Sequence, residues 1–482
     1  MDEQVGMESN RNASGLRPVH RYQHVLCVYP YRADWRTGSG WPPLGLEIVA
    51  TAIHPYAREV DIIDLRCESG DAASFVRPRT DLICFSVNWE SQIGFVREQI
   101  RSVPPEILTI VGGRHATEDP EAWLSACPNV NILVRGDGED IVDEISRGRP
   151  LEEIPGISFR RDGKLVHNRP GRSAPVQDAL YPRRGLRHYT YTLDLGGVKG
   201  RRFDTVASSR GCPFNCRFCS FSLNPWGTKR AWSARSPESV VREIEQSDAE
   251  IIGFLDDIFT HDVERVAAIC DLLVARGIRK RYAVNARIEI ARRPDILMKM
   301  QKAGFSLLLL GIESAQDATL RSMKKGFDTA KVREYFSVLR HSSMLLLGYF
   351  IVGNIGEDEG QMRQIVPFAR EIGLDLLNLC LLRNETYSGL DELISATPGY
   401  HTAPGGDKIV YSDRYSVAHL RRLQRRMLQQ FYTPGHLLHI GKRALRNGLV
   451  TPGMLARIPL WLVGSGLRSI GNGRSRSAWG KG

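Results

Sequence analysis

The chain has 482 residues, of which 42% are hydrophobic and 25% are charged. These proportions are typical of a folded globular protein and argue against a disordered chain, and nine scattered cysteines argue against a disulfide scaffold. The formal net charge of +11 comes from the C-terminal end, because residues 414–482 carry thirteen Lys and Arg and no Asp or Glu. The length predicts about three domains.

Residues 1–20 are polar and show no hydrophobic periodicity. We predict a disordered leader there, because such a segment cannot bury enough apolar surface to fold. It contains no apolar run of the kind that a secretory signal needs, so we predict a cytoplasmic protein with reduced cysteines.

Residues 21–165 alternate short apolar runs with helical patterns. Continuous apolar strands separated by helices are typical of a parallel, doubly wound α/β sheet of the Rossmann-like type. Ligands of such sheets bind beyond the carboxyl ends of the strands. Glycines at that edge let a large ligand approach the backbone. The predicted strands are 24–29, 59–65, 81–87, 107–112 and 131–135.

We predict a solvated linker for residues 166–200, which are rich in Arg and Tyr. Residues 201–400 then repeat a strand followed by a helix six times. Six such units predict a partial (β/α)6 barrel of the TIM type, which carries its chemistry in loops at the carboxyl ends of the strands. The predicted strands are 205–208, 251–255, 281–286, 307–311, 344–352 and 376–382.

The most specific motif lies in the loop after the first of these strands. Residues 210–220 read RGCPFNCRFCS, so three residues separate Cys212 from Cys216 and two separate Cys216 from Cys219. Soft thiolates suit iron–sulfur centres, and three of them can hold three irons of a [4Fe-4S] cube and leave one iron open. A structural zinc site is the alternative, but it needs a fourth ligand close by, and His261 and Cys270 lie too far along the chain.

This loop, with the aromatic Phe218 before its last cysteine, resembles the signature of the radical S-adenosylmethionine (SAM) superfamily. The order of the domains resembles the subgroup with an N-terminal cobalamin (B12)-binding domain. The resemblance implies that Cys212, Cys216 and Cys219 hold a [4Fe-4S] cluster as metal ligands and that the open iron binds SAM. It also implies that an external donor such as flavodoxin or ferredoxin supplies the electron.

Further stretches at the ends of barrel strands match the superfamily in the expected order. The residues that the resemblance assigns to SAM binding are Phe218, Asp256, Glu313, Ser314 and Gly353. The loop after the sixth strand, residues 383–387, departs from the family pattern, so the sequence leaves the substrate open.

In the N-terminal domain, Ser86 and the pair Gly112 and Gly113 match the cobalamin-binding pattern. Residues 34–38 lack the histidine that this pattern offers to cobalt as a lower axial ligand. The alternative for this domain is a degenerate sheet that binds nothing.

The resemblance implies a reaction in which SAM cleavage gives a 5′-deoxyadenosyl radical and methylcobalamin hands a methyl group to a substrate radical. We predict a C-methyltransferase that acts on an unactivated carbon of a lipid, a pigment such as a tetrapyrrole, or another secondary metabolite. An oxidative cyclase or rearrangement enzyme without methyl transfer stays open, because relatives with this domain order cyclise tetrapyrroles or modify lipids. An RNA-modifying enzyme is the third alternative.

Residues 401–482 form a basic C-terminal region, in which we predict an amphipathic helix at 417–432 and a second apolar and basic segment at 455–470. Basic residues beside Trp and Leu fit a segment on an anionic membrane surface, and a helix docked on the barrel is the equal alternative. No base-stacking module is visible, so we do not expect a nucleic-acid partner. Removal of residues 414–482 is expected to leave cluster binding intact but to weaken association with a membrane or with the substrate.

Overall fold

The computed structural model describes residues 20–454 except 34–40, 91, 172, 174, 196–197, 225 and 406. The predicted leader at residues 1–20, apart from its last residue, lies outside this part, as do the loop at 34–38 and the segment at 455–470.

The N-terminal sheet has seven strands in the order β2-β1-β3-β4-β5-β6-β7. The first five in that order are parallel, as predicted, and their near-continuous apolar sequences are buried between two layers of helices. An antiparallel hairpin, β6 and β7, extends the edge beside β5. The bounds are β1 (Tyr22–Tyr29), β2 (Ala57–Asp64), β3 (Thr80–Ser86), β4 (Leu108–Gly112), β5 (Ile132–Val134), β6 (Ile157–Arg161) and β7 (Lys164–His167). The helices are α1 (Leu44–Ile53), α2 (Ile93–Arg101), α3 (Arg114–Glu118), α4 (Pro120–Ala126) and α5 (Gly138–Ser146).

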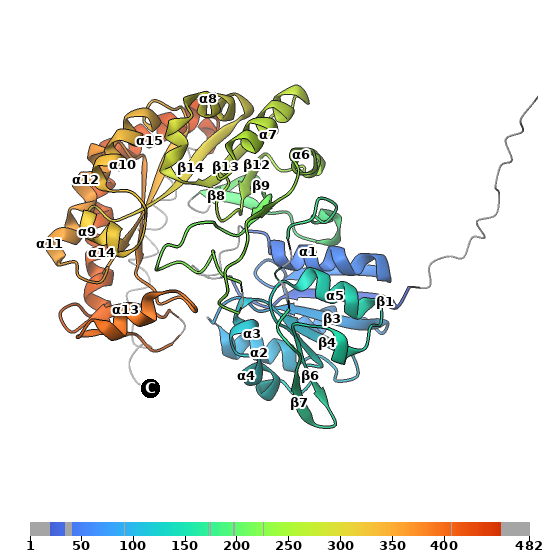
Figure 1. Ribbon diagram of the computed structural model, residues 1–482. Coiled ribbons are helices and arrows are strands. Elements are labelled where there is room, and N and C mark those ends of the chain that lie inside the picture. Colours follow the sequence, from blue (N-terminus) through green and yellow to red (C-terminus); the bar gives the residue numbers. More distant parts are fainter. Residues whose placement is uncertain are drawn as a thin grey trace, which may run out of the picture.

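The second sheet also has seven strands, in the order β16-β15-β14-β13-β12-β9-β8. All are parallel to their neighbours except β8, which pairs antiparallel with β9 at the open edge. The sheet curves and its helices line the outer side, which makes a partial barrel (Figure 1). The strands are β8 (Thr192–Leu195), β9 (Val198–Val206), β12 (Ile251–Phe254), β13 (Arg281–Ala286), β14 (Phe305–Glu313), β15 (Leu345–Val352) and β16 (Leu376–Leu381). The outer helices include α6 (Pro237–Gln246), α7 (Val263–Ala275), α8 (Pro294–Ala303), α10 (Thr329–Leu339) and α12 (Ile365–Glu371). The two sheets confirm the predicted fold class.

The predicted basic helix is α14 (Val417–Phe431), and α15 (Pro434–Arg446) follows it. The apolar face of α14 belongs to the same core as the barrel strands and their helices, through Leu420, Leu423, Met427 and Phe431. Of the two alternatives for this helix, docking on the barrel is therefore confirmed. The core position of α14 argues against the prediction that cluster binding survives removal of residues 414–482, because their loss would strip a face from this core. Within the described ranges, no helix is both long enough and apolar enough to cross a membrane.

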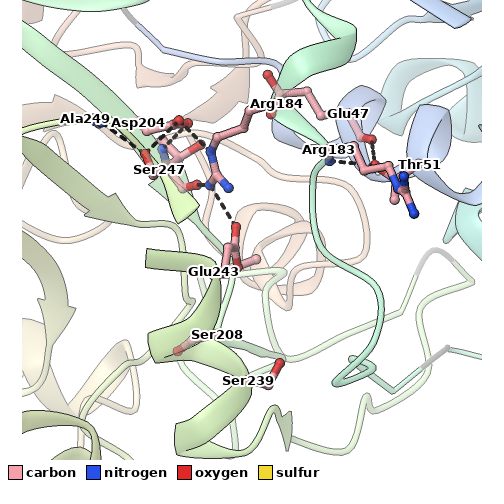
Figure 2. Close-up of polar contacts among 12 residues, drawn as sticks. Glu47, Thr51, Arg183, Arg184, Asp204, Ser208, Ser239, Glu243, Ser247 and Ala249 are labelled. Atoms are coloured by element: carbon pink, nitrogen blue, oxygen red, sulfur yellow. Dashed lines mark hydrogen bonds and ion pairs between the residues drawn. The ribbon is translucent and has the colours of Figure 1, made fainter. Parts of the chain in front are cut away.

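Two arginines of the linker, Arg184 and Arg187, are not solvated, because they lie in a largely buried ion-pair network between the N-terminal domain and the barrel. Figure 2 shows the part of this network around Arg184. Arg187 donates to Glu47 of α1 at 2.9 Å and to Asp204 of β9 at 2.7 Å. Arg184 donates to Asp204 at 2.5 Å and to Glu243 of α6 at 2.8 Å. The three carboxylates are at most 1% exposed, so the prediction of a solvated linker is wrong at these residues.

The pKa values of Glu47 and Asp204 reflect both burial and the neighbouring guanidinium groups. Burial raises the pKa of Glu47, although Arg187 opposes this effect. Burial also acts to raise the pKa of Asp204, but Arg184 and Arg187 outweigh it and hold that pKa below its ordinary value. An unpaired buried charge costs several kcal/mol, so the network holds the N-terminal domain against the barrel in one arrangement.

We predict that Arg187→Met destabilises the protein by about 3–5 kcal/mol, because it leaves Glu47 and Asp204 buried without their shared cation. Arg202→Met is the matched control, since Arg202 pairs with Asp248 on the surface, where the two side chains are 51% and 69% exposed. The control should change the free energy of unfolding by less than about 0.5 kcal/mol. Urea denaturation followed by fluorescence measures both, and equal midpoints for the two variants would contradict the role of the network.

Candidate active site

The cysteine loop is anchored to the barrel by two neighbouring aspartates after β12. Asp256 is fully buried and accepts hydrogen bonds from the amide and hydroxyl of Ser208, at 2.8 and 2.5 Å, and from the hydroxyl of Ser209 at 2.6 Å. Asp257 accepts a bond from the amide of Gly211 at 2.8 Å, and burial raises its pKa to about 6. Asp256 therefore supports the start of the loop, whereas Asp257 faces the space beside it.

The three cysteines are half-buried on this loop. Burial raises the pKa of Cys212 and raises that of Cys219 to about 12, so these thiols are protonated until a metal displaces the proton. The amide of Phe221 donates to Sγ of Cys219 at 3.4 Å, a type of bond that also stabilises metal-bound thiolates. Among the described residues, no three His, Cys, Asp or Glu side chains gather closely enough to hold a single metal ion.

Aromatic side chains hold the loop from both sides. Phe218 packs against a small apolar cluster that includes Met323, Leu390 and Val410. The guanidinium of Arg287, at the end of β13, lies 3.8 Å from the centre of the Phe214 ring. These contacts support the loop, and they leave the Phe218 side chain partly buried against that cluster.

Glu313, the last residue of β14, lies close to the loop through a lysine that sequence reasoning missed. Lys325 donates to Glu313 at 3.2 Å, and its Nζ is 5.8 Å from the centre of the Phe218 ring. The backbone of Glu313 has a positive φ of +77°. Residues other than glycine adopt this conformation mainly where the surrounding structure enforces it, often at functional sites. No sequence signal pointed to Lys325, because only the fold brings it near β14.

Ser314 and Gly353 lie at the same end of the barrel, but each faces a neighbouring element. The Ser314 hydroxyl donates to Glu357 at 2.5 Å, and both side chains are buried. Gly353 has φ of +87°, and a Cβ built there would lie 3.0 Å from the Leu420 side chain of α14. Only glycine therefore lets the helix pack so closely against the end of β15.

A cavity of about 480 Å³ lies between the two domains and beside the cysteine loop. Ser86, Gly112 and Gly113 line it from the N-terminal domain, as predicted for a ligand at the strand ends. The barrel supplies the opposite wall, which includes Ser209, Arg210, Ser220, Phe221, Leu255, Asp257 and Tyr387. The fold thus places the strand ends of the N-terminal sheet and the cysteine loop of the barrel around the same cavity.

Glycine is required where the cavity wall turns sharply after β4. Gly113 has φ of +110°, and a Cβ there would lie only 2.5 Å from the carbonyl oxygen of Val87. Gly136, after β5, has φ of +99° and also lines the cavity. The absence of side chains at this edge leaves backbone in reach of a large ligand.

Ion pairs tie the cysteine loop to the turn after β5. Arg210 lies 2.6 Å from Glu139 and 3.4 Å from Asp137. Arg230 donates to both carboxylate oxygens of Asp137, at 2.9 and 2.8 Å. Sequence reasoning assigned no role to residues 136–139, although a Gly-Asp-Gly-Glu turn at the carboxyl end of a strand was a usable signal.

A second set of contacts crosses the cavity mouth from α3. Arg114 pairs with Glu385 at 2.6 Å and donates to the Ser220 hydroxyl at 3.2 Å. Glu118 pairs with Lys408 at 3.2 Å. These pairs are partly exposed, so they are weaker than the buried network at the linker.

Comparisons with known proteins agree with this arrangement. The model of the B12 binding domain matches residues 36–146, and the model of the radical SAM superfamily matches residues 206–369. An uncharacterized methyltransferase of Pyrococcus horikoshii, PH0819, is 28% identical over 354 residues, which cover 70% of this chain and 75% of the relative. Hopanoid C-3 methylase of Methylococcus capsulatus is 28% identical over 325 residues, which cover 64% of this chain and 60% of that protein.

Among solved structures, the radical SAM methyltransferase TsrM of Kitasatospora setae, with cobalamin and a [4Fe-4S] cluster bound, superposes with a TM-score of 0.64. The match covers 86% of this chain and 82% of TsrM at 18% identity, which establishes a shared fold. The two family matches and the cavity between the matched domains lead to one assignment. This chain belongs to the radical SAM superfamily, in the subgroup with an N-terminal B12-binding domain.

Proposed function

We propose that this chain is a cobalamin-dependent radical SAM enzyme that methylates an unactivated carbon of a small molecule. The observation that carries the proposal is the cavity of about 480 Å³ that has the glycine-rich strand ends on one wall and the cysteine loop beside the other. A methyl donor on the first wall and a radical source on the second would face a common substrate. The methyltransferase relatives support this choice over other radical reactions.

Cys212, Cys216 and Cys219 are the proposed ligands of the [4Fe-4S] cluster. Glu313 is the proposed contact for the polar groups of SAM, since it lies near Phe218 through Lys325. Phe218, Asp256, Ser314 and Gly353 act by holding the site, because their side chains or Cβ positions are occupied by protein neighbours. This role differs from the direct SAM contact that the resemblance implied for them.

Ser86, Gly112 and Gly113 are the proposed cobalamin contacts. The cavity wall fits such a group, because Gly112, Gly113 and Gly136 line it and place backbone rather than side chains where a large ring and its tail would lie. Asn88 donates to the Ser86 hydroxyl at 3.0 Å and so orients it toward the cavity edge. When bound, the cluster with SAM supplies a 5′-deoxyadenosyl radical and cobalamin supplies the methyl group.

The protein's own contribution is to position these groups and to limit water. The buried network at the linker keeps the two walls at a fixed separation, and the pairs from α3 cross the mouth. Exclusion of water protects a carbon radical from side reactions. Phe221 and Leu255 are exposed on the barrel wall at 56% and 40%, which favours an apolar substrate such as a lipid, a pigment or another secondary metabolite.

We further propose a cytoplasmic enzyme that receives electrons from flavodoxin or ferredoxin. Peripheral membrane contact through the basic C-terminal region stays a prediction, as does the alternative of oxidative cyclisation without methyl transfer.

Product mass tests the reaction class. Anaerobic enzyme incubated with lipid or pigment extract and SAM labelled with deuterium on its methyl group should yield a product heavier by one labelled methyl group in place of hydrogen. A product that has lost hydrogen and carries no label would identify a cyclase and overturn the methyltransferase proposal.

We predict that Cys216→Ala abolishes the brown absorbance of the anaerobically reconstituted protein, because two thiolates cannot hold the cluster. Cys270→Ala is the control, since Cys270 is buried in α7 away from the loop. The control should keep the iron content of the wild type. Unchanged iron in Cys216→Ala would refute the ligand assignment.

We predict that Gly113→Ala weakens cobalamin binding at least tenfold, about 1.4 kcal/mol or more, because the added Cβ forces the turn after β4 to move. Gly163→Ala is the control, since Gly163 also has a positive φ, of +75°, but no atom lies within 4 Å of its Cβ position. Titration of cobalamin followed by absorbance measures both. Equal affinity in the two variants would place cobalamin elsewhere.

A further inference from the structure

The outward face of α14 carries three exposed arginines for which the described part of the chain shows no ion pair. Arg421 pairs with Asp407 at 2.9 Å, whereas Arg422, Arg425 and Arg426 are exposed and contact no described carboxylate. Residues 414–482 contain no Asp or Glu, so the following sequence offers no partner either. Three uncompensated cations within five positions of one helix are an electrostatic feature that attracts anions.

On other helices of the barrel, exposed Lys and Arg side chains form ion pairs. Lys299 of α8 pairs with Asp271, and Arg333 of α10 pairs with Glu371. Other exposed cations without a described partner lie singly, with Arg242 on α6, Arg279 in the loop after α7 and Lys302 on α8. The cluster on α14 is therefore a property of this helix and not of the barrel surface in general.

The chemistry of this face fits a protein better than a lipid surface. The large apolar side chains of α14 that are fully buried, such as Leu423 and Met427, point into the barrel core. A helix that lies in a membrane surface needs a free apolar face to insert, whereas the apolar face of α14 is buried in the barrel core. What remains outward is Arg and Gln, which favours a partner with a complementary acidic surface.

The buried side of α14, opposite the arginines, is connected to the cysteine loop through packed side chains. Phe218 packs on the small cluster that contains Ile355, Leu390 and Val410. Val410 begins β18 (Val410–Ser412), which contacts α14. Leu420, in the first turns of α14, packs on Gly353 at the same end of the barrel as the loop. A protein seated on these arginines would therefore be separated from the loop by α14 itself and by the packed residues around Phe218.

We propose that the arginine face of α14 is the docking surface for an acidic one-electron carrier of the flavodoxin or ferredoxin class. The inference rests on the proposed function, which requires one electron from outside for each cleavage of SAM. The carrier loses one electron and the [4Fe-4S] cluster gains it, and no covalent bond changes in this step. Long-range attraction to the arginines speeds the encounter, so the rate falls as salt rises.

The test replaces Arg422, Arg425 and Arg426 together with Glu, and its control makes the same charge change at Arg242, Arg279 and Lys302. Cluster reduction is followed anaerobically by absorbance, once with flavodoxin hydroquinone and once with dithionite. The α14 variant should be reduced at least tenfold more slowly by flavodoxin, whereas the control variant should match the wild type. All three proteins should react equally with dithionite, which needs no docking surface.

Each other outcome contradicts a defined part of the account. Wild-type rates with flavodoxin in the α14 variant would overturn the docking face. Equal slowing with dithionite would do so too, because the substitutions would then have damaged the cluster site itself. Binding to anionic vesicles that the substitutions abolish, with flavodoxin reduction unchanged, would assign the face to a membrane instead. A wild type that dithionite cannot reduce would contradict the proposed function itself.

Discussion

The arrangement of the two domains depends on the buried charges around Asp204. This carboxylate on the first parallel strand of the barrel binds Arg184 and Arg187 of the linker, and Arg187 reaches Glu47 of the N-terminal domain. Charges at this depth are tolerated only with their partners in place, so the contact admits essentially one geometry. That geometry turns the strand ends of the N-terminal sheet toward the cysteine loop and creates the cavity between them.

The cysteine loop itself is fixed by groups that do no chemistry. Asp256 bonds to Ser208 and Ser209, and Phe218 packs into an apolar cluster behind the loop. Arg210 then ties the loop to Glu139 of the other domain. These contacts hold the three cysteines at a fixed position relative to the opposite wall of the cavity. A reaction that uses two cofactors requires such fixed positions.

Much of this arrangement was predictable from local sequence. Apolar runs of strand length separated by helical patterns are enough to predict two parallel sheets, and cysteine spacing points to the loop. What could not be predicted depends on contacts between distant residues. Two adjacent aspartates, Asp256 and Asp257, look alike in sequence, yet only the second faces the cavity. The arginines of the linker look solvated until Asp204 and Glu47 are brought beside them.

The central claim is that one chain holds an iron–sulfur cluster and cobalamin on facing walls of a single cavity. The most direct test is metal analysis together with an ultraviolet–visible spectrum of protein expressed with cobalamin and purified without oxygen. The account predicts about four iron and about one cobalt per chain in the same preparation. Protein that contains neither iron nor cobalt after anaerobic reconstitution, and that never cleaves SAM when reduced, would contradict it.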